Sequence, residues 1–224
     1  MKSALVVGAT GTIGSALCRR LALDGFSIAP EWISKSRPDL SSEEAFASIP
    51  DDLDVAIFAA GVNAICPVDE LSILDWNHVV DINLSSAFRF AQKVIRNIRN
   101  QNPKIVFISS IMANHPYPDR TAYAAAKGGL ESLCRALAVE SRGRYSTIAV
   151  RLGHIDRLMA STVASANLLP AVRELSPDKT LTSPEEVANL IVDILPHMSL
   201  INGAIIDADR GYTINRWPLI NFRD

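Results

Sequence analysis

Two side chains that can move a proton are spaced to share one face of a predicted helix. Tyr123 and Lys127 lie four positions apart in a segment whose pattern predicts a helix over residues 122–141. Positions i and i+4 of a helix point the same way, so the phenol and the ammonium group can face one cleft. A nearby cation favours phenolate and lowers the pKa of a phenol from about 10 toward a value useful for proton transfer. The same spacing also fits an amphipathic helix with a buried tyrosine and a lysine that reaches solvent.

A glycine-rich turn near the start of the sequence predicts a dinucleotide site. The apolar run 4–7 predicts a buried strand, and it leads into Gly8, Gly11 and Gly14, followed by a helical pattern over 13–23. Glycines allow a tight turn and close approach of the backbone to a diphosphate, whose charge is met by the amides and positive end of the helix. The alternative interpretation is an ordinary turn between a strand and a helix.

Together with Ser110, which ends an apolar run thirteen positions before Tyr123, these motifs resemble the short-chain dehydrogenase/reductase (SDR) family. Further segments that match the family are the turn Ala60-Gly61, the helical segment that contains Asn83, the strand at 105–110 and the closing strand and glycine turn at 201–211. The resemblance implies an α/β fold in a single domain, residues 1–224, with a Rossmann-type doubly wound parallel sheet and helices on both faces. It also implies a substrate lid at 154–183.

The resemblance assigns four catalytic positions, Asn83, Ser110, Tyr123 and Lys127. Ser110 is preferred to Ser109 because it keeps the family's spacing to the tyrosine. The implied reaction is hydride transfer between nicotinamide and a carbonyl or secondary alcohol. Ser110 would bind the substrate oxygen and Tyr123 would give or take the proton. Lys127 would lower the pKa of Tyr123 and hold the nicotinamide ribose, and Asn83 would anchor a water that connects Lys127 to solvent.

The cofactor choice depends on the end of the second strand, where an acidic residue binds the 2′-hydroxyl of NAD and a basic residue accommodates the 2′-phosphate of NADP. If that strand extends through 32–34, Lys35 and Arg37 flank the ribose and favour NADP(H) over NAD(H). An end nearer Glu31 favours NAD(H), and both basic residues also fit solvated loop charges. The cofactor-binding positions implied by the resemblance are Gly8, Thr10, Gly11, Thr12, Ile13, Gly14, Ser34, Lys35, Arg37, Asp39, Leu40, Ala60, Gly61, Tyr123, Lys127, Gly153 and Ile155.

Departures from the family pattern keep two other functions open. The Gly-x-x-Gly-x-x-Gly spacing is similar to that of extended and atypical branches, Ala59 stands where the family usually has Asn, and Leu152-Gly153 replaces Pro-Gly. One alternative is a sugar-nucleotide epimerase or dehydratase, although the sequence after Gly153 leaves little room for the separate substrate domain of those enzymes. The other is a non-catalytic dinucleotide-binding protein, although such proteins usually lack the Tyr or the Lys.

The substrate is not identified by the sequence. His115 and Tyr117 are candidates for the wall opposite the lid, although a lone loop histidine is more often solvated. The lid mixes apolar and basic residues. A sugar, a small ketone, an acyl chain and an aromatic alcohol are all compatible with this mixture.

Length and composition agree with one globular α/β domain. The chain has 224 residues, 48% of them hydrophobic, and a formal net charge of −2, which gives no basic excess for nucleic acid or an anionic membrane. Neither a signal peptide nor an apolar run of about 20 residues is found, and the three cysteines show no metal-ligand spacing. We therefore expect a cytoplasmic protein with reduced thiols and no metal.

Strand-like and helical runs alternate, as in a parallel sheet covered on both faces. The helices at 74–100 and 122–141 resemble those through which the family forms dimers and tetramers, and the second is apolar on more than one side, so we expect a homodimer or homotetramer. The region 29–54 is short for the two strands and two helices that the family places there. The predicted strands are 4–7, a short one within 26–34, 55–59, 105–109, 147–152 and 204–207, and the predicted helices are 13–23, 42–48, 74–100, 122–141 and 184–195.

Overall fold

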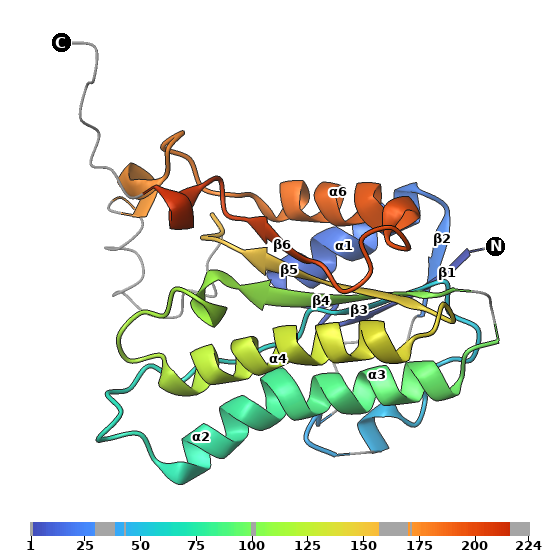
Figure 1. Ribbon diagram of the computed structural model, residues 1–224, viewed down its shortest axis with the longest axis horizontal. Coiled ribbons are helices and arrows are strands. Elements are labelled where there is room, and N and C mark those ends of the chain that lie inside the picture. Colours follow the sequence, from blue (N-terminus) through green and yellow to red (C-terminus); the bar gives the residue numbers. More distant parts are fainter. Residues whose placement is uncertain are drawn as a thin grey trace.

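A parallel sheet of six strands lies at the centre of the protein, in the order β2-β1-β3-β4-β5-β6 (Figure 1). The computed structural model describes residues 2–29, 39–42, 44–99, 102–156, 170 and 172–215. The order turns back between β1 and β3, and in open α/β sheets ligands bind beyond the carboxyl ends of the strands at such a point. The strands are β1 (Lys2–Val7), β2 (Phe26–Ile28), β3 (Val55–Phe58), β4 (Lys104–Ser110), β5 (Ser146–Leu152) and β6 (Ile205–Ala208).

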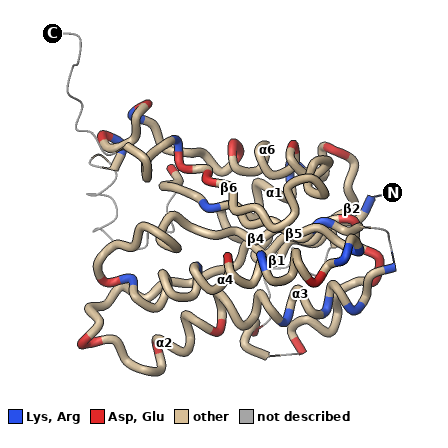
Figure 2. The backbone as a smooth tube through the Cα atoms, viewed as in Figure 1, with Lys and Arg blue, Asp and Glu red and all other residues tan. Residues whose placement is uncertain are grey.

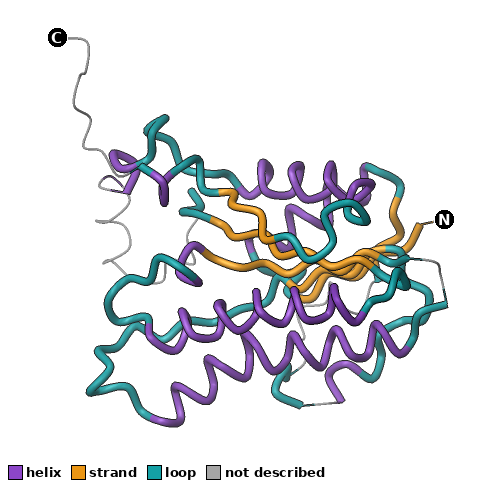
Figure 3. Tube along the Cα trace, in the orientation of Figure 1, coloured by secondary structure: helices purple, strands orange, loops and turns teal. Residues whose placement is uncertain are grey.

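Helices cover both faces of the sheet (Figure 3). One face carries α1 (Thr12–Leu23) and α6 (Pro184–Ile194). The opposite face carries α3 (Ser86–Arg96) and α4 (Thr121–Glu140). The helix α2 (Ile73–Val80) runs into α3 through a π-helical segment, η3 (Asp81–Ser85). Single 3₁₀ turns occur at η2 (Glu44–Phe46), η4 (Ile111–Ala113), η5 (Leu195–His197) and η6 (Tyr212–Ile214).

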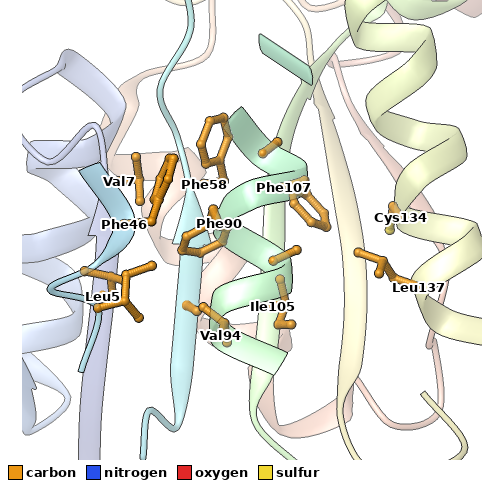
Figure 4. Packing of buried hydrophobic residues seen from close by; sticks show 14 of the residues in the cluster. Leu5, Val7, Phe46, Phe58, Phe90, Val94, Ile105, Phe107, Cys134 and Leu137 are labelled. Carbon is orange, nitrogen blue, oxygen red and sulfur yellow. The ribbon is translucent and has the colours of Figure 1, made fainter. Parts of the chain in front are cut away.

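Alternate side chains of the buried strands supply the two halves of the core. In β4, Ile105 and Phe107 pack toward α3 and α4, whereas Val106 and Ile108 pack toward α1 and α6. Figure 4 shows the first of these clusters, in which Phe90 of α3 lies among strand side chains. A strand buried on both faces needs apolar residues at every position, which is why these strands read as continuous apolar runs.

Most predicted elements are found in the structure, but the helix predicted at 42–48 is wrong. Among the described residues of that segment, only the single turn η2 forms, with Ala45 and Phe46 buried. Two buried apolar side chains give too little tertiary packing to stabilise a short helix. The helix predicted at 74–100 is interrupted by η3 and ends at Arg96. The proposed extension of the second strand through 32–34 lies outside the described residues.

Charged side chains of both signs are interspersed along the chain (Figure 2). Within the described ranges, no helix combines the length and apolar character needed to cross a bilayer. The described residues also contain no group of three or more His, Cys, Asp or Glu side chains arranged to hold a metal ion.

Candidate active site

The turn between β1 and α1 packs so tightly that only glycine fits at two of its positions. A Cβ atom on Gly14 would lie 2.0 Å from the carbonyl oxygen of Gly8, and one on Gly8 would lie 2.8 Å from the backbone nitrogen of Ala60. Gly8 also has a φ of +87°, which side chains other than glycine rarely tolerate. The turn therefore holds the start of α1 directly against the end of β3, at the point where the strand order reverses.

The start of α1 presents free backbone donors and the positive end of the helix dipole. Gly11 occupies the N-cap without a side-chain cap, and the first turn contains no acidic residue. A hollow of about 250 Å³ lies there, lined by Thr10, Gly11, Thr12, Ser15, Arg19, Pro184 and Glu185. Uncapped amides beside an open hollow are an anion site, so these residues fit the diphosphate of a dinucleotide.

Ser110 and Tyr123 meet at the carboxyl end of the sheet. The last residue of β4 is Ser110, whose Oγ accepts a hydrogen bond from the backbone N–H of Met112 at 3.3 Å and so begins the turn η4. The Tyr123 hydroxyl, from the first turn of α4, is hydrogen-bonded to the Ser110 side chain. By contrast, Ser109 points into the protein and donates to Glu131 at 2.7 Å. Ser110 is thus the serine that shares a site with the tyrosine.

Lys127 lies one turn after Tyr123 and is buried. Its Nζ donates to the carbonyl oxygen of Ile108 at 2.8 Å and lies 5.5 Å from the centre of the Tyr123 ring. Burial lowers the pKa of Lys127 to about 8, and the Glu131 carboxylate acts in the opposite direction. The two side chains therefore lie close together on one face of α4, as their spacing predicted.

The expected lowering of the Tyr123 pKa is not what the structure shows. Burial raises the pKa of Tyr123 above its ordinary value, and the hydrogen bond to Ser110 and the charge of Arg120 only partly oppose this. The free energy lost when a phenolate is removed from water is larger than the stabilisation that Ser110 and Arg120 give it. The predicted lowering of the Tyr123 pKa by Lys127 is therefore not observed in this structure.

Asn83 carries an unpaired oxygen into the same site. The side chain is fully buried in η3, and its Nδ2 donates to the carbonyl oxygens of Val62 at 2.7 Å and Val79 at 2.8 Å. Its Oδ1 has no hydrogen-bond partner. A Cβ on Gly61 would lie 2.8 Å from that Oδ1 and 3.7 Å from the Lys127 Nζ. The space beside Gly61 is therefore bordered by an amide oxygen and an ammonium group, a polar setting that suits a water or a hydroxyl.

The positions assigned to the adenosine half of the cofactor are described at Asp39 and Leu40. Asp39 is exposed, and its carboxylate accepts from the backbone and side chain of Ser41 at 3.0 and 2.7 Å. The carbonyl oxygen of Leu40 lies 3.4 Å from Nη1 of Arg89. The positions Ser34, Lys35 and Arg37 lie outside the described residues.

The segment after β5 carries Gly153 and Ile155, and it begins next to Leu152, which pairs with Ser110 across β5 and β4. A Cβ on Gly153 would lie 2.8 Å from the Asp209 Cα, so only glycine lets the two chain segments pass. Ile155 forms an isolated parallel bridge with Thr182, which brings the two ends of the predicted lid together. Residues 157–169 and 171 of the lid lie outside the described residues.

An aromatic cluster lies on the segments that flank the lid. The Tyr117 hydroxyl is 2.8 Å from His154 Nε2 and donates to the Tyr212 hydroxyl at 2.6 Å. A hollow of about 340 Å³ beside it is lined by His115, Pro116, Tyr117, Leu175, Tyr212, Thr213 and Asn215. Sequence reasoning named His115 and Tyr117 but missed His154 and Tyr212, because their meeting depends on how two distant loops fold back.

Comparison with known proteins identifies the family. Residues 39–213 match the family described as Enoyl-(Acyl carrier protein) reductase. The 3-oxoacyl-[acyl-carrier-protein] reductase MabA of Mycobacterium bovis is 27% identical over 94% of this chain and 92% of its own length. The acetoacetyl-CoA reductase of Cupriavidus necator is 29% identical over 84% of this chain and 87% of its own.

A solved structure shows the same fold. The crystal structure of BdcA in complex with NADPH aligns with a TM-score of 0.83 at 24% identity, over 93% of each chain. On the family match, the relatives and this shared fold, the chain belongs to the short-chain dehydrogenase/reductase family and is an NAD(P)-dependent oxidoreductase.

Proposed function

We propose that the protein transfers a hydride between NADP(H) and the carbonyl or secondary alcohol of a small molecule, with Tyr123 as general acid or base. The observation that carries the proposal is the convergence of Tyr123, Ser110, Lys127 and the unpaired Asn83 oxygen at the carboxyl ends of β3 and β4. Bound nicotinamide would supply the hydride chemistry. The protein has to hold the partners in place and move the proton.

Ser110 and Tyr123 are arranged to bind one oxygen atom. Their hydroxyls are already hydrogen-bonded to each other, so a substrate oxygen placed between them would receive a hydrogen bond from each. In the reduction, the Tyr123 hydroxyl gives its proton to the developing alkoxide. A raised pKa keeps Tyr123 protonated and ready for this role near neutral pH, and the oxidation requires the reverse transfer.

After the reduction, Lys127 and Asn83 would help to return a proton from solvent to Tyr123. The Lys127 ammonium lies beside the Tyr123 ring, and the Asn83 Oδ1 borders the same space next to Gly61. A water that accepts a hydrogen bond from Lys127 and donates one to the Asn83 Oδ1 would connect the tyrosine to solvent. The unpaired buried oxygen supports this role, because such an atom is costly unless something binds it.

The choice of NADP(H) rests on Lys35 and Arg37. A charge-assisted contact to the 2′-phosphate contributes about 1.5 to 3 kcal/mol, which is roughly a tenfold to hundredfold preference for NADPH over NADH. Replacing both residues with Ala should erase the preference by weakening NADPH while NADH affinity stays the same. A wild-type preference for NADH would contradict the proposal and point to a strand end nearer Glu31.

A homo-oligomer and a cytoplasmic location complete the proposal. The three cysteines, Cys18, Cys66 and Cys134, are free thiols in the structure. Free cysteines are usual where thiols are kept reduced, which supports the cytoplasm. The evidence for the oligomer is the exposed apolar surface of α3 and α4, which is tested below.

The function is tested by following NADPH and NADH oxidation with a panel of ketones, sugars, quinones and a 3-oxoacyl thioester. The thioester belongs in the panel because two relatives are named as reductases of such compounds. Carbonyl-dependent oxidation of either cofactor supports the proposal. Tight cofactor binding without turnover of any carbonyl compound would instead indicate a non-catalytic dinucleotide-binding protein.

A further inference from the structure

A buried ionic cluster lies directly behind the catalytic helix. Glu131 of α4 is 4% exposed, and its two carboxylate oxygens accept from Nε and Nη2 of Arg151 in β5 at 2.9 and 2.7 Å. Ser109 of β4 donates to the same carboxylate at 2.7 Å. Arg151 then reaches Asp207 of β6 at 2.7 Å. The fork-shaped pairing of an arginine with a carboxylate is a strong and geometrically specific contact.

The register of the sheet builds this cluster. Ser109 pairs with Arg151 across β4 and β5, and Arg151 pairs with Asp207 across β5 and β6. These three residues therefore form a row across three strands, one position before the strands end. Glu131 comes down on this row from α4. The ties fix the helix that carries Tyr123 and Lys127 to the strand that ends in Ser110.

Glu131 is also the acidic neighbour of Lys127. It follows Lys127 by four positions, so the two buried side chains share one face of α4. Its negative charge favours the ammonium form of Lys127 against the effect of burial. In the described part of the chain, the titratable groups against Lys127 are Tyr123 and Glu131. Those against Glu131 are Arg151, Cys134 and Lys127, with Asp207 behind Arg151.

We propose that Glu131, held by Arg151 and Ser109, is a positioning residue that fixes α4 on the sheet and keeps Lys127 charged for its role beside Tyr123. The inference rests on the proposed function for its catalytic meaning. Its electrostatic part concerns this chain's own lysine and can be measured without turnover. A carboxylate that only ties the helix to the sheet would leave the titration of Lys127 unchanged when its charge is removed.

The first test is the pH titration of Lys127 followed by NMR of ¹³C-labelled lysine, in wild type and Glu131→Gln. Glutamine keeps the size of the side chain and an oxygen that accepts from Ser109, but it removes the charge. We expect the pKa of Lys127 to fall by about one unit. An unchanged Lys127 pKa in folded Glu131→Gln would overturn the proposal, whether or not the protein reduces any carbonyl compound. Glu140→Gln, the same change at an exposed position of α4, serves as the control and should leave the titration in place.

Glu131→Gln leaves Arg151 with a poorly paired charge, which destabilises the fold. The second test therefore uses a double variant. Glu131→Gln combined with Arg151→Met removes both charges and keeps comparable volume. Its Lys127 pKa should still lie below that of wild type, because the nearer charge has been removed, and kcat should fall at alkaline pH while KM changes little. A double variant with the Lys127 titration and the pH profile of wild type would overturn the proposal. Absence of turnover in wild type would count against the proposed function alone.

Discussion

Lys127 has its ammonium group buried, and burial disfavours that charge. The structure compensates with one hydrogen bond, from Nζ to the carbonyl oxygen of Ile108, and with the more distant carboxylate of Glu131. Neither fully replaces water, so the pKa of Lys127 lies near 8 instead of 10.5. A lysine in this condition costs stability but can exchange protons close to physiological pH.

The cost should be visible as a pH-dependent stability. Because the pKa of Lys127 is lower in the folded than in the unfolded protein, the unfolded chain binds more protons between pH 8 and 10.5. The destabilisation is therefore fully present below pH 8 and disappears above 10.5. Denaturant unfolding of wild type and Lys127→Met should show the variant's advantage in unfolding free energy shrinking by about 2 kcal/mol from pH 7 to 10. A difference that does not change with pH would contradict this account, and Lys179→Met at an exposed site is the control.

At the level of elements, the first turn of α1 decides whether a dinucleotide can approach. Gly14 has no room for a methyl group, because the Gly8 carbonyl oxygen would be 2.0 Å away. Gly11 is less constrained, with the same oxygen at 3.2 Å, and Gly128 of α4 has only an ordinary contact at 3.6 Å. The three glycines thus form a graded series within one protein.

Substitution of each glycine with Ala should follow that series. Gly14→Ala should move the turn and reduce cofactor affinity by at least about 100-fold, Gly11→Ala should cause a smaller loss, and Gly128→Ala should leave affinity unchanged. Cofactor fluorescence titration measures the affinities, and circular dichroism establishes that each variant is folded. Equal affinities in all three variants would mean that the diphosphate binds elsewhere.

The elements that could be predicted from sequence are those with their own local signal. The strands at 55–59 and 105–109 are continuous apolar runs, and the turn at Gly8 combines a strand, glycines and a helix in one short segment. The π-helical segment η3 has no such signal, because it depends on Asn83 reaching the Val79 carbonyl that a regular helix would use for its backbone.

In the candidate site, too, some features could be predicted from the sequence and others only from the fold. The spacing of Tyr123 and Lys127 placed them on one face, but the direction of the Tyr123 pKa shift depends on burial, which spacing does not report. The contact between Glu131 and Arg151 joins a helix to a strand twenty residues later. It depends on how α4 packs against β5, which only the folded structure defines.

For the whole molecule, α3 and α4 leave apolar side chains without a partner inside the chain. Phe88 is 46% exposed and Val139 is 82% exposed, and Ala125 and Ala136 are exposed as well. Other apolar residues of α4, such as Leu130, belong to the core of the subunit and do not contribute. The exposed part is what a symmetric partner helix would cover.

Light scattering at micromolar concentration should therefore show a dimer or tetramer. Phe88→Glu combined with Val139→Glu should shift the protein toward the monomer, because each carboxylate would be desolvated in the interface. Val68→Glu, at an exposed apolar position before α2, is the control for the added charge. A mass of only 24.3 kDa for wild type would rule the oligomer out.

The central claim is that Tyr123 gives and takes the proton during the reaction, whereas cofactor binding does not depend on its hydroxyl. The most direct measurement is kcat and cofactor affinity of Tyr123→Phe, compared with Tyr145→Phe, which removes a buried hydroxyl just before β5, at the opposite end of that strand from Gly153. Loss of kcat by about 100-fold or more in Tyr123→Phe, with cofactor affinity nearly intact and Tyr145→Phe close to wild type, is the predicted result. A Tyr123→Phe enzyme that retains more than about a tenth of the wild-type kcat would contradict the account.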